Sequence, residues 1–197
     1  METMKVSCGK RQGNKALMLC NTLALTGIAV PCDSSIFLAI LAIHIPSGIV
    51  CVLAGLVALL SKKQPGRHPK FGTIYYWSLS VVFVSASIMA GLRWAEDHHL
   101  FILGTLSFAA ATFGRMAHRR CWHDWVRLHI TGMGLSYILM LTAFYVDNGK
   151  NLPLWKELPR IAYWILPSAV GLPLIANALL RHPLVRQAET GSTSNGR

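Results

Sequence analysis

The chain has 197 residues, of which 53% are hydrophobic and only 14% are charged, and its formal net charge is +11. A soluble domain carries about a quarter charged residues, and one core of this size cannot hide several helices that are apolar on all sides. The composition therefore argues against a soluble protein. It also argues against nucleic acid as a partner, because the basic residues flank apolar stretches.

The first apolar stretch, residues 16–30, follows a basic N-terminal segment, residues 1–15. A helix of this length spans about 22 Å, which is short for a hydrocarbon layer of about 30 Å. The basic flank and the small residues Gly27 and Ala29 are also typical of a signal peptide with its cleavage site. We favour a retained first span and keep a cleaved signal as the alternative.

Five further stretches are long enough to cross a membrane as helices. Four of them contain no Asp, Glu, Lys or Arg: residues 36–60, 71–92, 128–146 and 161–180. The fifth, residues 100–117, needs Arg115 to extend its charge to the interface, which is common near a helix end. The sequence therefore predicts an all-α polytopic transmembrane helical bundle over residues 16–185, with six spans, or five if a signal is removed. The polar end, residues 186–197, is predicted to be a disordered tail.

Charge predicts the orientation of this bundle independently of hydropathy. One side collects 15 of the 19 Lys and Arg residues, in segments 1–15, 61–70, 115–127 and 181–197. Basic loops of membrane proteins face the cytoplasm. The sequence therefore predicts that these segments and the C-terminus are cytoplasmic, and that segments 31–35, 93–99 and 147–160 face outward.

Histidines are the only ionisable candidates for chemistry within or beside the spans. His44 and His129 lie inside spans, whereas His68 and His99 lie at span edges. Ionisable residues in membrane spans are functional candidates. No carboxylate lies in a span, which argues against an ion-coupled transporter.

Three of these histidines are followed by glycine three or four residues later, at Gly48, Gly72 and Gly132. This spacing is typical of helical bundles that bind haem, because haem iron takes imidazole as an axial ligand and glycine leaves room beside it. The alternative is that these are helix-packing seams, each with a hydrogen-bonded histidine.

Depth within the spans sorts the four histidines into two pairs. His68 and His129 are predicted at nearly the same depth on the basic side, as two axial ligands of one iron must be. His44 and His99 fit less well as an outer pair, because His44 lies about 12 Å inside its span and His99 lies at the edge. This two-site arrangement resembles the cytochrome b561 class, which implies haem b as the cofactor.

Two polar segments outside the spans have alternative interpretations. Residues 93–99 could bind a divalent metal through carboxylate and imidazole groups, or could form a solvated loop with an internal ion pair. The basic run 115–127 could bind anionic lipid, or could serve only as an orientation signal. Pro167 and Pro173 are expected to kink the last span.

Four motifs together resemble a group of bacterial membrane proteins classed as a domain of unknown function. They are HIPSG at 44–48, GRHPKFG at 66–72, RLHITGMG at 127–134 and LTAFYVDNG at 141–149. The resemblance covers residues 36–185 and implies a helical bundle of the bacterial inner membrane, without an activity.

Three hypotheses about function therefore stand. The first is electron transfer through haem b bound by histidines. The second is transport or binding of a small molecule, and the third is a structural or regulatory role without chemistry. No motif decides whether the protein is an enzyme, and none indicates its oligomeric state.

Overall fold

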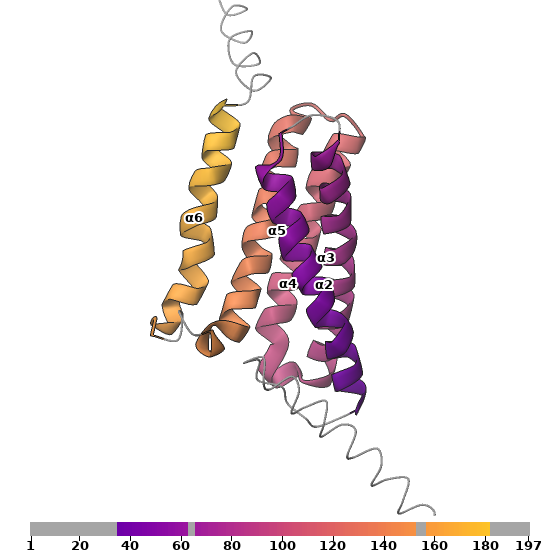
Figure 1. Cartoon of the computed structure of the whole chain (residues 1–197), viewed down its shortest axis with the longest axis vertical. Helices are drawn as coiled ribbons and strands as arrows, with labels where there is room; N and C mark the ends of the chain where they lie inside the picture. The colour runs from indigo at the N-terminus through magenta and orange to yellow at the C-terminus, as the bar shows by residue number, and fades with distance from the viewer. Residues whose placement is uncertain (1–34, 63–65, 153–156, 182–197) are drawn as a thin grey trace, which may run out of the picture.

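Figure 1 shows the computed structural model of the chain, in which long helices run alternately up and down. The structure describes residues 35–62, 66–152 and 157–181. Its elements are α2 (Ser35–Leu60), α3 (Arg67–Leu92), α4 (Trp94–Arg119), α5 (Trp125–Asn148), the short 3-10 helix η1 (Gly149–Asn151) and α6 (Arg160–Arg181). The predicted all-α class and five of the predicted spans are confirmed as helices. The predicted first span at 16–30 and the predicted tail at 186–197 lie outside the described residues.

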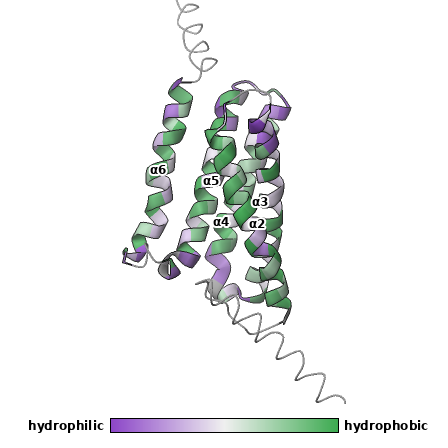
Figure 2. Ribbon diagram, in the orientation of Figure 1, coloured by the Kyte–Doolittle hydropathy of each residue, from purple (hydrophilic) through white to green (hydrophobic). Residues whose placement is uncertain are grey.

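All five long helices are long and apolar enough to cross a membrane. Figure 2 shows hydrophobic residues along the helices and hydrophilic ones gathered mainly near their ends. Large aliphatic side chains on the outer faces remain more than half exposed, among them Leu53, Val84 and Val170. Lipid tails solvate such side chains as well as a protein core does, so the exposed apolar surface is the one that a membrane protein requires.

The helices extend beyond the apolar stretches, because their first and last turns reach the polar interface. The prediction of a loop at residues 93–99 is therefore wrong except at its first residue. Only Arg93 breaks the helical path, with φ −136° and ψ 49°, and α4 begins at the next residue. Asp97 and its polar neighbours lie in the first turns of α4, where a carboxylate is favoured by the helix dipole.

Consecutive helices pack side by side, and α2 also approaches α5. Helices α2 to α5 thus form a four-helix bundle in which α3 and α5 are diagonally opposed, while α6 packs along α5 (Figure 1). The basic connections after α2 and after α4 lie at the same end of this bundle. We call it the basic end.

A polar network crosses the middle of the bundle between diagonal helices. Tyr75 of α3 is buried, and its hydroxyl lies 2.7 Å from Oγ of Ser136 on α5. Ser107 of α4 donates a hydrogen bond of 2.8 Å to the carbonyl of the same Ser136. Buried polar groups must be paired to be tolerated, and these pairs also fix how α3, α4 and α5 are aligned along their axes.

The closest backbone contact in the bundle joins α4 and α5 at two glycines. A Cβ added to Gly132 would lie 2.8 Å from both the carbonyl oxygen of Ala110 and Cα of Gly114. Small residues at such crossings let helix backbones approach closely in membranes. No side chain larger than hydrogen fits at Gly132 without separating the two helices.

This contact predicts a large difference between two glycine-to-alanine substitutions. Gly132→Ala forces α4 and α5 apart and should lower the free energy of unfolding by about 1–3 kcal/mol. Gly72→Ala is the matched control, because no atom lies within 4 Å of the added Cβ and alanine favours the helix. The free energy of unfolding of both variants is measured in detergent micelles. Equal stability of the two would show that the α4–α5 contact is looser than described.

Candidate functional site

The two histidines predicted at the same depth lie together at the basic end of the bundle. His68 is in the first turn of α3, and His129 is in the second turn of α5. Their ring centres are 6.3 Å apart, and the ring planes are nearly perpendicular, at 82°. Because α3 and α5 are diagonal partners, the two imidazoles face each other across the bundle.

Each of these histidines is held by a backbone carbonyl of a neighbouring helix. Nδ1 of His68 lies 2.9 Å from the carbonyl oxygen of Ala58 on α2. Nδ1 of His129 lies 3.0 Å from the carbonyl oxygen of Gly114 on α4. A carbonyl oxygen can only accept a hydrogen bond, so Nδ1 must carry the proton in both rings. In the neutral form the lone pair is then on Nε2, and this arrangement is the usual one for histidines that bind a metal.

The helix ends explain why these contacts form. The last turn of α2 lies beside the first turn of α3, so Ala58 reaches His68 across the short connection. The carbonyl of Gly114 is within reach of α5 because the two backbones approach closely at this glycine. The same close approach at Gly132 brings His129 within reach, one turn earlier on α5.

A third imidazole adjoins the pair, and the predicted pairs did not include it. His118 lies in the last turn of α4, with its ring centre 5.3 Å from that of His129 and 4.9 Å from that of Trp125. The short connection from Arg119 to Trp125 is the sequence feature that could have predicted the position of His118. Such a short turn places the last turn of α4 beside the first turn of α5.

We call His68, His118 and His129 the histidine layer. Basic side chains adjoin it in sequence and space. Arg67 and Arg127 lie one and two residues before ligand candidates, and the guanidinium of Arg115 lies over the ring of Tyr76, 4.7 Å from its centre. The layer is thus open to an anionic or electron-rich ligand more than to a free cation.

His44 and His99, the predicted outer pair, have separate surroundings. Nδ1 of His44 lies 2.8 Å from Oγ of Ser85 on α3. The ring of His99 lies instead against His98 and against Trp164 of α6, with centres 5.6 and 6.3 Å away. From the helix starts, the two lie about 6 Å apart in depth. The structure gives this pair no shared site.

The three glycines that follow histidines at the predicted spacing lie in two different environments. Gly48 and Gly72 have no atom within 4 Å of an added Cβ, so space is open beside them. Gly132 is filled by the backbone of α4 and therefore acts as a packing residue. Of the glycines that follow His68 and His129, only Gly72 has open space beside it.

Among the described residues, no group of three or more His, Cys, Asp or Glu side chains has the geometry to hold a metal ion. The polar segment 93–99 therefore gains no support as a divalent metal site. The two imidazoles of His68 and His129 could still bind a metal ion whose remaining ligands come from a cofactor.

Comparisons with protein-family models, with curated proteins and with solved structures found no match. The resemblance to a bacterial family of unknown function and to the cytochrome b561 class stays a prediction. A function for this protein is therefore inferred from the geometry of the histidine layer.

The carbonyl contacts predict the tautomers of His68 and His129. In protein labelled with ¹⁵N-histidine at neutral to alkaline pH, both rings should show a protonated Nδ1 and an unprotonated Nε2, because each Nδ1 faces an acceptor. The single variants His68→Gln and His129→Gln assign the signals. A protonated Nε2 on either ring would contradict the hydrogen bonds described here.

Proposed function

We propose that the protein binds one b-type haem at the histidine layer and carries electrons in the membrane. The observation that carries the proposal is the pair His68 and His129, two imidazoles on diagonal helices with both Nδ1 protons anchored to carbonyl oxygens. Anchoring from behind orients an imidazole and raises its basicity toward iron. A packing histidine needs no partner imidazole.

The spacing of the pair supports coordination of one iron from both sides. A bond from imidazole nitrogen to metal is about 2 Å, and the nitrogen lies about 1 Å from its ring centre, so opposed imidazoles on one metal have centres roughly 6 Å apart. The distance between His68 and His129 is 6.3 Å. Perpendicular ring planes are compatible with this arrangement, because each plane need only contain its own nitrogen–metal bond.

The remaining residues of the site have supporting roles. Arg67, Lys70 and Arg127 provide positive charge beside the layer for the carboxylates of the haem edge, and charge-assisted pairs of this kind are strong. His118 lies against His129, and Trp125 lies against His118. Haem bound there would supply a one-electron carrier, His68 and His129 would hold its iron, and the protein would supply a low-dielectric environment and the charge of the basic end.

Visible spectroscopy tests the proposal directly. The detergent-purified protein, expressed with ample haem, should show a Soret band and, on reduction with dithionite, sharp α and β bands. His68→Ala and His129→Ala should each lose most of the bound haem, because one axial ligand is missing. His99→Ala is the matched control and should retain it. A featureless spectrum, or full occupancy and an unchanged spectrum in His129→Ala, would reject the site.

We also propose that the basic end faces the cytoplasm of a bacterial cell and that the bundle lies in the inner membrane. Lys62, Arg120 and Arg181 are at this end, whereas Asp97 and Asp147 are at the other. This distribution follows the orientation rule for basic loops. The basic end then also faces anionic lipid headgroups of the inner leaflet.

Reporter fusions check this orientation. Alkaline phosphatase fused after residue 62 should be inactive, because the enzyme needs the oxidising periplasm, and the same reporter fused after residue 93 should be active. A green fluorescent protein at the same positions serves as the control and should give the opposite pattern. Active phosphatase after residue 62 would reverse the assignment.

A further inference from the structure

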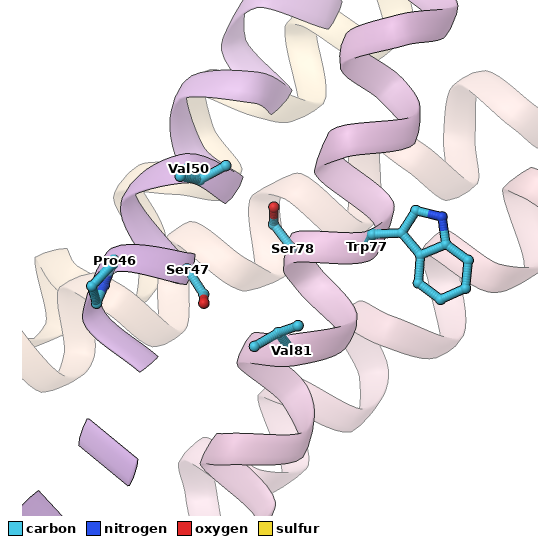
Figure 3. Close-up of a pocket in the computed structure, with 6 residues that line it drawn as sticks. All are labelled: Pro46, Ser47, Val50, Trp77, Ser78 and Val81. Atoms are coloured by element: carbon cyan, nitrogen blue, oxygen red, sulfur yellow. The ribbon is translucent and has the colours of Figure 1, made fainter. Parts of the chain in front are cut away.

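A shallow groove of about 330 Å³ lies between α2 and α3, away from the histidine layer. Six residues line it: Pro46, Ser47, Val50, Trp77, Ser78 and Val81. Figure 3 shows Ser47, Ser78 and Val81 around the space between the two helices, with the Trp77 ring turned to the other side of α3. Both helices are candidate membrane spans, so the groove is open to lipid.

The groove lies at mid-membrane depth. Ser47 is near the centre of the 26-residue helix α2, and Ser78 is near the centre of the 26-residue helix α3. The hydrocarbon layer is about 30 Å thick, which puts lipid headgroups about 15 Å from this level. Only molecules that dissolve in the hydrocarbon reach the groove, and phospholipids present acyl chains there.

Among the described residues, some hydroxyl residues of the spans bond their own helix and others have no partner, and the groove is where two of the latter, Ser47 and Ser78, lie together. Ser80, Ser87 and Thr105 each donate to the backbone carbonyl four residues earlier, at 2.7–2.9 Å. Within the described part of the chain, Ser47 and Ser78 have no hydrogen bond. A hydroxyl without a partner in hydrocarbon is unfavourable, so both donors are available to an acceptor from the membrane.

Pro46 disturbs the same turn of α2. Proline has no N–H, so it cannot bond the carbonyl of Ala42 as a helical residue otherwise would. The groove therefore combines two hydroxyl donors and a disturbed turn of α2 with the apolar walls of Val50 and Val81.

We propose that this groove binds the ring of a lipid-soluble quinone. A quinone is flat and apolar and carries two carbonyl oxygens, so its acceptors complement the partial positive charges of the two serine hydroxyls. An acyl chain offers no acceptor, and a phospholipid headgroup does not reach this depth. The assignment of a redox carrier, rather than another lipophilic carbonyl compound, rests on the proposed function.

The position of the groove relative to the histidine layer suits this partner. Ser78 lies ten residues after His68 on the same helix, about 15 Å along its axis. Trp77 contacts Tyr76 edge to face, with ring centres 5.7 Å apart, on the same stretch of α3. A quinone in the groove and an electron carrier at the histidine layer are thus one helix segment apart.

Photolabelling tests the groove without depending on haem. The protein is placed in lipid nanodiscs, labelled with an azido-ubiquinone analogue and mapped by mass spectrometry, with decylubiquinone as competitor and decylbenzene as the apolar control. Label should concentrate in residues 46–50 and 77–81. Decylubiquinone should displace it, and decylbenzene should not.

Variants separate the hydroxyl donors from the groove itself. The double variant Ser47→Ala/Ser78→Ala should weaken competition by decylubiquinone about tenfold, since two hydrogen bonds are lost. Ser80→Ala, whose hydroxyl bonds Tyr76, should leave it unchanged. Val81→Phe fills the groove and should reduce labelling even if the double variant folds poorly.

Three outcomes would overturn the proposal: equal competition by decylbenzene, unchanged competition in the double variant, or label spread over all lipid-facing helices. A stable dimer that the double variant dissociates would assign the groove to a second copy of the chain and would also overturn it. The experiment is run on protein with and without added haem. If protein with added haem is labelled specifically but shows no Soret band, the groove proposal is kept and the haem site is rejected. If it shows a Soret band but no specific labelling, the haem site is kept and the groove proposal is rejected.

Discussion

The contact between Gly114 and Gly132 is the constraint on which the rest of the site depends. It brings α4 and α5 so close that an added Cβ would meet backbone atoms at 2.8 Å. The close approach also brings the carbonyl of Gly114 within reach of Nδ1 of His129, from which it accepts a hydrogen bond. One small-residue contact therefore fixes the helix spacing, the depth of His129 and its tautomer. In hydrocarbon, where the hydrophobic effect gives no drive for helices to associate, such close packing and interhelical hydrogen bonds hold a bundle together.

Three polar pairs between helices lie at separate levels of the bundle. His68 and His129 lie at the basic end, Tyr75 and Ser136 in the middle, and His44 with Ser85 toward the other end. Ser85 donates to the carbonyls of Val81 and Val82, so its oxygen accepts from His44. The outer histidine is thus satisfied by one hydroxyl within its own helix pair, whereas the inner histidines face each other.

Hydropathy predicted most of the fold and only part of the site. Uninterrupted apolar stretches are a strong signal, and the helices of residues 36–60, 71–92, 128–146 and 161–180 followed from it. Helix ends did not, because interfacial turns are polar: the supposed loop at 93–99 is mostly the start of α4. Glycine spacing alone also failed to separate Gly132, which packs, from Gly72, which is open. That distinction depends on the neighbouring helix, and a single sequence does not specify which face of a helix meets which partner.

Spacing in the sequence also does not distinguish a histidine that packs from a histidine that binds a metal. The geometry of the structure helps to distinguish them. A packing histidine is satisfied when its polar atoms have partners, and His44 meets that condition with Ser85. His68 and His129 share more than this, since two rings anchored in the same way lie 6.3 Å apart on diagonal helices. Bringing two such imidazoles together at the charged end of a membrane bundle desolvates both and yields little packing energy. A group that binds between them would offset this cost, which is why the histidine layer, and not the outer pair, carries the functional argument.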